Sequence, residues 1–275
     1  MNTVRKLVKS PLIKALGAKS LRGRIIYELR NRYFEDLNFS IPLGEDFHCP
    51  ITEADSAYSF SEIFVNSEYA DFLQRIPFPR RWLDLGCHAG YFSLYLAWQR
   101  VVRKLEGDYQ ALLLDADGRA GHRIAAVLRV NPLEGRFIFQ HGAISREPGE
   151  VRFAQRGGMG SSLDFTDPAV SAVEVVKVID AANIAELMAP PYDLIKIDVE
   201  GAEIDFMEAY ESVYRQAKWL IVEWHSWDME GLKEKVVREG FESRGFKMEA
   251  VLKPKKSGLV DGLPLSTGTH MYARI

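Results

Sequence analysis

The sequence predicts an α/β protein with a doubly wound, mostly parallel sheet, on two observations. Short apolar runs that are typical of buried strands alternate with segments whose apolar residues recur at helical spacing, from residue 81 almost to the C-terminus. Carboxylates end several of these runs, as Asp115 does after Ala111–Leu114 and Asp198 after Tyr192–Ile197. Because such sheets bind ligands at the carboxyl ends of their strands, a site is expected along this edge.

Length and composition narrow the class of protein. The chain has 275 residues, 27% of them charged, and a formal net charge of -3. This charge gives no global basic field, so we expect no nucleic-acid partner. Cys49 and Cys87 are too few for a disulfide framework, and no apolar run reaches the ~20 residues that cross a bilayer. We therefore expect a cytoplasmic protein without a transmembrane segment.

We divide the chain into an N-terminal helical or irregular extension, residues 1-55, and a main domain, residues 56-275. Basic residues interleaved with apolar ones dominate the first 35 positions. One interpretation is an amphipathic surface that makes weak contact with anionic lipid or an acidic partner. The other, which we favour, is a helical cap whose apolar side packs on the main domain. The sequence leaves the oligomeric state open.

Each element follows from local pattern. Residues 1–40 predict a helix broken at Pro11, and the Pro- and Gly-containing stretch 41–55 predicts irregular structure with at most a short strand. Residues 56–75 predict one or two lead-in helices. The strands of the predicted sheet are 81–85, 111–115, 136–141, 192–198, 219–224, 246–252 and 270–274. The helices between them are 91–105, 119–130, 180–188, 202–217 and 231–243. Stretches 150–154 and 172–179 predict a β-excursion around a glycine-rich loop, 157–162, and 253–268 predicts a basic Gly/Pro-rich loop.

The turn after the first strand, Asp84-Leu85-Gly86-Cys87-His88-Ala89-Gly90, is the first candidate site. A glycine turn between strand and helix lets the backbone approach a ligand closely. His88 stands where a dinucleotide-binding turn has its second glycine, so a nicotinamide or flavin cofactor is disfavoured. Alone, this turn is also compatible with simple packing of the helix on the sheet.

The second candidate is Asp115, at the end of the second strand. An acid there can accept hydrogen bonds from both ribose hydroxyls of a nucleoside. Asp117, two residues further on, competes for this role, and either carboxylate can instead cap the following helix. We favour Asp115.

The third candidate is the block Asp193-Leu-Ile-Lys-Ile-Asp-Val-Glu-Gly-Ala-Glu203, whose turn carries three carboxylates and a glycine. Lys196 within it can simply neutralise a neighbouring acid. The cluster Glu223-Trp224-His225 ends the next strand, and His225 is the best general base by its reference pKa. A lone histidine is also often structural, and we weigh the two roles about equally.

With these residues the chain resembles the FkbM family of S-adenosylmethionine-dependent methyltransferases. The resemblance lies in Trp82–Gly86 with Gly90, in the unbroken 193–203 block, in Tyr58-x-x-x-Glu62-Ile-Phe, and in Ala143-Ile-Ser with Gly149. It covers the chain from about Tyr58 onwards. It implies a seven-stranded, Rossmann-like methyltransferase sheet in residues 56-275, S-adenosyl-L-methionine as cofactor, and methyl transfer, usually to a hydroxyl oxygen.

The resemblance also implies roles for individual residues. Asp84, Gly86 and Gly90 would hold the methionine part of the cofactor. Asp115 would take the ribose and Asp117 would flank the adenosine, although the family more often has Glu-Pro where this chain has Asp115-Ala116. The full set of expected cofactor-binding residues is Asp84, Gly86, Cys87, His88, Gly90, Asp115, Ala116, Gly142, Ala143 and Asp198.

The expected catalytic residues are Asp198, Glu200 and His225, with His225 or Asp198 as the base that removes the acceptor's proton. A divalent metal on Asp198 and neighbouring oxygens is a second route, which we do not assign because Glu223 and Glu203 can also face away from the site. The expected acceptor is a hydroxyl of a small molecule or glycan. The alternatives are a catalytically silent binding module with this fold and a nucleotide-cofactor oxidoreductase.

Overall fold

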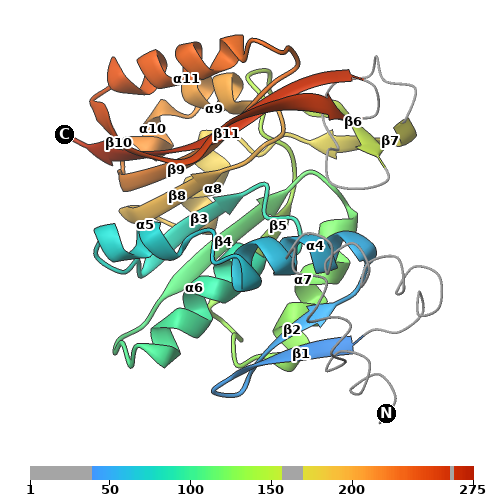
Figure 1. Cartoon of the computed structure of the whole chain (residues 1–275), viewed down its shortest axis with the longest axis vertical. Coiled ribbons are helices and arrows are strands. Elements are labelled where there is room, and N and C mark those ends of the chain that lie inside the picture. Colours follow the sequence, from blue (N-terminus) through green and yellow to red (C-terminus); the bar gives the residue numbers. More distant parts are fainter. Residues whose placement is uncertain (1–38, 157–169, 261–262) are drawn as a thin grey trace, which may run out of the picture.

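The computed structural model describes residues 39–156, 170–260 and 263–275, which form a central sheet with helices on both faces (Figure 1). The predicted N-terminal helix with its basic surface and the glycine-rich loop 157–162 lie outside the described residues. Within the described ranges, no helix is long and apolar enough to cross a membrane.

Seven strands make the central sheet. In spatial order they are β10 (Phe246–Val260), β11 (Leu263–Arg274), β9 (Ala217–Ser226), β8 (Tyr192–Ile197), β3 (Arg81–Leu85), β4 (Gln110–Asp115) and β5 (Phe137–His141). From β9 to β5 all neighbours are parallel, whereas β11 runs antiparallel to both β9 and β10. This order, with one antiparallel strand inserted second from the edge, is that of the class I methyltransferase fold. The predicted α/β fold class is confirmed.

Helices cover both faces of the sheet (Figure 1). They pack in two separate hydrophobic clusters, one on each face. One face carries α4 (Ala54–Phe60), the π-helix η1 (Ser61–Val65), α5 (Ala70–Arg75), α6 (Tyr91–Val102) and α7 (Arg119–Val130). The other carries α8 (Ala181–Leu187), α9 (Glu203–Ala209), α10 (Glu211–Tyr214) and α11 (Leu232–Glu242). Because side chains alternate along a strand, Trp82 packs in the first cluster and Leu83 and Leu85 in the second. Both faces of the strands are therefore dry, and only their ends are open to a ligand.

The stretch predicted to be irregular, 41–55, instead contains an antiparallel hairpin of β1 (Phe39–Gly44) and β2 (Phe47–Ile51). Proline has no N–H to donate, but each strand of a two-stranded ribbon has one edge that pairs with no other strand. Pro42 in β1 and Pro50 in β2 therefore do not cost the hydrogen bonds to a further strand that they would cost in a wider sheet. Phe47, Cys49 and Ile51 are buried in the same cluster as α6 and α7. The described part of the predicted extension thus packs on the main domain, while the boundary at residue 55 stays a prediction.

The predicted loop 253–268 was also wrong, because β10 and β11 pair along almost their whole length. Shifts of register between Val251 and Lys253, and again between Lys253 and Lys256, accommodate the Lys/Pro-rich stretch. The predicted helix 202–217 is divided into α9 and α10 at Tyr210. The predicted β-excursion is confirmed as a separate hairpin of β6 (Glu150–Arg156) and β7 (Val170–Lys177).

Candidate functional site

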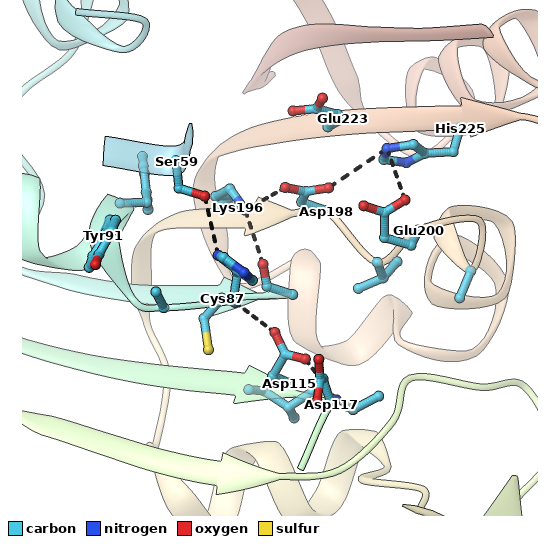
Figure 2. A pocket seen from close by; sticks show the side chains of 18 of the residues that line it. Ser59, Cys87, Tyr91, Asp115, Asp117, Lys196, Asp198, Glu200, Glu223 and His225 are labelled. Carbon is cyan, nitrogen blue, oxygen red and sulfur yellow. Dashed lines mark hydrogen bonds and ion pairs between the residues drawn. The ribbon is translucent and has the colours of Figure 1, made fainter. Parts of the chain in front are cut away.

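A cavity of about 400 Å³ lies at the carboxyl ends of the parallel strands (Figure 2). Of the residues predicted for the site, those that line it are Gly86, Cys87, His88, Asp115, Ala116, Gly142, Ala143, Asp198, Glu200 and His225. Two more, Asp84 and Gly90, are not among its lining residues. The structure therefore brings together, around one space, residues that are up to about 140 positions apart in the chain.

The glycine turn after β3 is shaped by packing as well as by backbone conformation. Gly86 has φ +73°, and a Cβ built on it would lie 1.6 Å from the backbone oxygen of Asp198, so only glycine lets the ends of β3 and β8 approach. Gly90, at φ +72°, is the N-cap residue before α6, and a Cβ there would lie 2.4 Å from Cδ1 of Ile124. The N–H groups of Gly86 and Cys87 both donate to the carbonyl of Leu114 on β4. Gly86 thus shapes the cavity wall, whereas Gly90 supports it from behind.

Asp84 is completely buried behind this turn. Its Oδ2 accepts a hydrogen bond from Ser93 Oγ at 2.7 Å, and Ser93 in turn accepts one from Trp82 Nε1 at 2.9 Å. Burial raises the pKa of Asp84, and the ammonium of Lys196, 3.7 Å from Oδ1, acts in the opposite direction. Asp84 therefore anchors the turn and Lys196 rather than facing the cavity.

Asp115 joins the first two βα turns. Its Oδ2 accepts from the backbone N–H of His88 at 2.6 Å, and its Oδ1 accepts from that of Asp117 at 2.8 Å. Burial raises the pKa of Asp115 to about 6, although both N–H donors favour the charged form. Each carboxylate oxygen has two lone-pair sites, so one remains on each for a ligand in the cavity.

The competing candidate, Asp117, is committed elsewhere. Arg119 binds both of its carboxylate oxygens, with Nε and Nη2 contacts of 2.6–2.9 Å, and Arg123 Nη1 lies 3.6 Å from Oδ2. Although burial opposes it, the hydrogen bonds and charge of Arg119 lower the pKa of Asp117. Arg123, itself buried, also binds Glu53 before α4. Asp115 is consequently the better placed of the two acids for a ribose.

Beside Asp115 the wall is formed by small residues. The N–H of Gly142 donates to the carbonyl of Asp115 at 2.9 Å, and His141 Nε2 lies 3.0 Å from the carbonyl of Ala116. A Cβ on Gly142 would lie 2.2 Å from Cγ1 of Ile179. Ala116, Gly142 and Ala143 thus leave a shallow surface next to the carboxylate.

His88, in the glycine turn, is tied to the lead-in helix α4. Its Nδ1 lies 3.2 Å from Ser59 Oγ, a contact that no local sequence pattern indicates because the residues are 29 positions apart. Burial, with the charge of Arg123, lowers the pKa of His88 to about 4. The imidazole is therefore neutral at physiological pH. Cys87 is buried too, and burial raises the pKa of its thiol, so it is an inert wall residue.

On the opposite wall, Lys196 links the ends of β3 and β8. Its Nζ donates to Asp198 Oδ2 at 2.9 Å and to the carbonyl of Gly86 at 3.3 Å (Figure 2). Although burial alone would lower the pKa of Lys196, the charges of Asp198 and Asp84 raise it above its usual range. Lys196 therefore neutralises its neighbouring acids, a role that the sequence had left open.

The three predicted catalytic residues meet at this wall. His225 Nε2 lies 3.5 Å from Glu200 Oε2 and 3.9 Å from Asp198 Oδ1 (Figure 2). His225 Nδ1 lies 2.9 Å from Oε1 of the fully buried Glu203. Although burial opposes it, the charges of Glu200, Glu203 and Asp198 raise the pKa of His225 to about 10. An imidazole that already carries two protons accepts no third, so His225 is not the base in this charge state. Burial raises the pKa of Glu200 to about 7. Although burial opposes them, the charges of Lys196 and His225 lower the pKa of Asp198, so Glu200 is the stronger proton acceptor of the two carboxylates.

Three further lining residues, Lys253, Glu223 and Glu62, had no site role in the prediction from sequence. Lys253 Nζ, on the long β10–β11 hairpin, bonds Glu68 Oε1 at 2.8 Å and Glu223 Oε2 at 3.2 Å, so the hairpin reaches the lead-in segment over the cavity. Glu223, considered able to face away, lines the cavity, whereas Glu203 does not. Burial raises the pKa of Glu62, another lining residue, to about 7. Glu62 belongs to the Tyr58-x-x-x-Glu62 motif, which contributed to the family resemblance but was given no role in the site.

Comparisons with known proteins add little to this geometry. No family model matches the sequence, and no curated protein matches it. Solved structures similar to this chain include a putative O-methyltransferase from Klebsiella pneumoniae (14% identity, 98% of this chain and 96% of that one, TM-score 0.43). Another is a putative RNA methyltransferase from Pyrococcus horikoshii (12% identity, 80% of this chain and 85% of that one, TM-score 0.44). A third is M. jannaschii TYW2 in complex with AdoMet (11% identity, 88% of this chain and 89% of that one, TM-score 0.41). Identities and TM-scores this low assign no family, cofactor or substrate to the chain; its own strand order identifies the fold.

Proposed function

We propose that this protein is an S-adenosyl-L-methionine-dependent methyltransferase, of the FkbM type, that methylates a hydroxyl oxygen on a small molecule or sugar in the cytoplasm. One observation carries the proposal. In a sheet with the methyltransferase strand order, a single cavity has the Asp115 carboxylate on one wall and the Asp198–Glu200 pair on the opposite wall. Such a cavity can hold a nucleoside at one side and an acceptor at the other.

The cofactor half would be formed by the glycine turn and the second strand end. Asp115 would accept the ribose hydroxyls through its remaining lone pairs, and the small residues Ala116, Gly142 and Ala143 would lie along the adenosine. The methionine part would extend past Gly86 towards Asp198. That direction would place the positive sulfonium near a carboxylate that interacts favourably with it.

The acceptor half would align a hydroxyl with the transferred methyl group. Displacement at the methyl carbon needs an in-line approach of the acceptor oxygen and removal of its proton. Asp198 and Glu200 would accept that proton, and His225, held by Glu203, would fix the positions of both carboxylates. The wall formed by Glu62, Glu223 and Lys253 is polar, which favours a hydroxylated acceptor over an apolar one.

Calorimetry and a transfer assay on the full chain test this proposal. We expect S-adenosylmethionine to bind and Asp115→Asn to weaken binding at least about tenfold, since hydrogen bonds to a charged group contribute about 1.5–3 kcal/mol. Mass spectrometry of a metabolite extract should show transfer of a labelled methyl group, lost in Glu200→Gln with cofactor binding retained. Asp71→Asn, on the exposed side of α5, is the matched control and should change neither. Absence of cofactor binding by the wild-type protein would refute the proposal.

The same experiments separate the alternatives. A catalytically silent binding module would bind the cofactor but transfer no methyl group to any component of the extract. A nucleotide-cofactor oxidoreductase would bind NAD or FAD in preference to S-adenosylmethionine. His88 opposes the second alternative, because its side chain occupies the position at which a dinucleotide turn needs a second glycine.

A further inference from the structure

The acceptor wall contains an arrangement of polar atoms that ordinary packing does not explain. His225 is only 4% exposed, yet its Nε2 faces the cavity and makes no hydrogen bond within the described ranges. The nearest acceptors, Glu200 Oε2 at 3.5 Å and Asp198 Oδ1 at 3.9 Å, lie beyond normal hydrogen-bond length (Figure 2). One carboxylate oxygen each of Asp198 and Glu200 and one ring nitrogen of His225 all lie within 4.8 Å of one another.

Glu203 determines which ring nitrogen faces this gap. Its Oε1 accepts hydrogen bonds from His225 Nδ1 and from the backbone N–H of Gly201, both at 2.9 Å, and the whole side chain is buried. With its proton on Nδ1, a neutral imidazole directs the lone pair of Nε2 towards two carboxylate oxygens. Three electron-rich atoms that converge in this way require a positive charge between them, either a proton on Nε2 or a metal ion.

From this convergence we infer that Asp198 Oδ1, Glu200 Oε2 and His225 Nε2 bind a divalent transition-metal ion, which replaces the proton that Nε2 carries in the metal-free protein. One imidazole and two carboxylates suit Mn²⁺, Fe²⁺, Co²⁺ or Zn²⁺, whereas Mg²⁺ and Ca²⁺ prefer oxygen ligands alone. Bonds of about 2.1 Å put neighbouring ligand atoms about 3.0–3.5 Å apart. Of the distances from His225 Nε2, the 3.5 Å to Glu200 Oε2 already lies in this range, and the 3.9 Å to Asp198 Oδ1 is a few tenths of an ångström above it. Glu203 is the outer carboxylate that orients the histidine ligand.

The surroundings favour an ion with open coordination positions rather than a closed structural site. The hydrogen bond from Lys196 Nζ takes one lone-pair site of Asp198 Oδ2, and Oδ1 is the oxygen closer to His225 Nε2 in the group of three, so Asp198 would bind the ion through Oδ1. Three protein ligands leave further positions, and the three residues all line the cavity. The inference rests on the proposed function only here: the ligand at an open position would be the acceptor's hydroxyl oxygen.

The test is metal binding to the full chain, stripped with a chelator and desalted. Titration calorimetry with Mn²⁺ should give one ion per chain, and Co²⁺ should give a visible absorption band that His225→Ala changes. Asp198→Asn and Glu200→Gln should each weaken Mn²⁺ binding at least tenfold, and Glu203→Gln about 10–100-fold, as expected for an outer-shell partner. The matched control is Glu223→Gln, a lining carboxylate outside the group of three ligands, which should change the affinity less than threefold.

Two results would overturn the inference: no saturable binding of Mn²⁺, Co²⁺ or Zn²⁺ by the wild-type protein, or equal weakening by Glu223→Gln and Asp198→Asn. The wild-type titration does not depend on whether any variant folds, and circular dichroism checks the variants. Calorimetry with S-adenosylmethionine on the metal-free protein distinguishes the two proposals. If the cofactor binds but no ion does, the proposed function stands and this inference fails; binding of the ion alone reverses that conclusion.

Discussion

Replacing Gly86 with alanine should separate the two halves of the candidate site. The new Cβ would lie 1.6 Å from the backbone oxygen of Asp198, about 1.8 Å short of the 3.4 Å at which ordinary contact begins. That oxygen belongs to backbone, so a side-chain rotation cannot relieve the overlap. The ends of β3 and β8 must move apart, which strains the hydrogen bond from the N–H of Asp198 to the carbonyl of Leu85 at 3.0 Å.

The magnitude follows from two contributions. Alanine at φ +73° costs about 1–2 kcal/mol for the left-handed backbone alone. Displacing packed strands adds about 1–3 kcal/mol. We therefore expect Gly86→Ala to lower the free energy of unfolding by about 2–5 kcal/mol and to weaken S-adenosylmethionine binding, because the turn and Asp198 no longer face each other at the same distance.

Gly135→Ala is the matched control. Gly135 has nearly the same φ, +71°, but a Cβ there would meet nothing within 4 Å. This variant should therefore show only the backbone cost of about 1–2 kcal/mol and no loss of cofactor affinity. Urea denaturation with an unchanged m-value gives the comparison. Equal destabilisation of the two variants would refute the argument from close approach.

Three further predictions concern individual side chains. Affinity for S-adenosylmethionine should be constant above pH 7 and fall as the pH drops through about 6. Burial raises the pKa of Asp115 to about 6, and only its charged form accepts hydrogen bonds from both ribose hydroxyls. Calorimetry from pH 5 to 8 measures the affinity, and Asp115→Asn should remove its pH dependence. Lys196→Met should lower the free energy of unfolding by about 3–5 kcal/mol, since it leaves Asp84 buried without its cation. If Lys196→Met destabilises an Asp84→Asn protein less than it destabilises the wild type, the pairing is supported; equal destabilisation in both would contradict it. Lys253→Met should raise the KM for the acceptor and leave cofactor affinity unchanged, because the ion pairs that Lys253 makes within the described ranges, with Glu68 and Glu223, lie on the acceptor side of the cavity. Reduced cofactor affinity would be inconsistent with the division of the cavity.

Local pattern was sufficient for most of the elements. The strand that ends at Asp115 and the helix 119–130, whose observed bounds equal the predicted ones, follow from residues that interact within a few positions of one another. Local sequence pattern gave the wrong element where the surrounding tertiary structure, and not the intrinsic propensity of the residues, decided the backbone conformation. The prolines of the β1–β2 hairpin are tolerated only because that ribbon has free edges, and the Lys/Pro-rich stretch stays in β10 only because shifts of register absorb it.

The sequence by itself determined that Asp115, Asp198 and His225 end strands, and therefore that they gather at one edge of a sheet. Only the tertiary structure decided what they do there. The insertion of β11 between β9 and β10 brings the hairpin with Lys253 against Glu68, a pairing of residues 185 positions apart that no local periodicity encodes. The charge on His225 depends on the sum of Asp198, Glu200 and Glu203 in a buried space. Strand patterns are local properties of the chain, whereas the protonation of a site depends on every charge that the fold places around it.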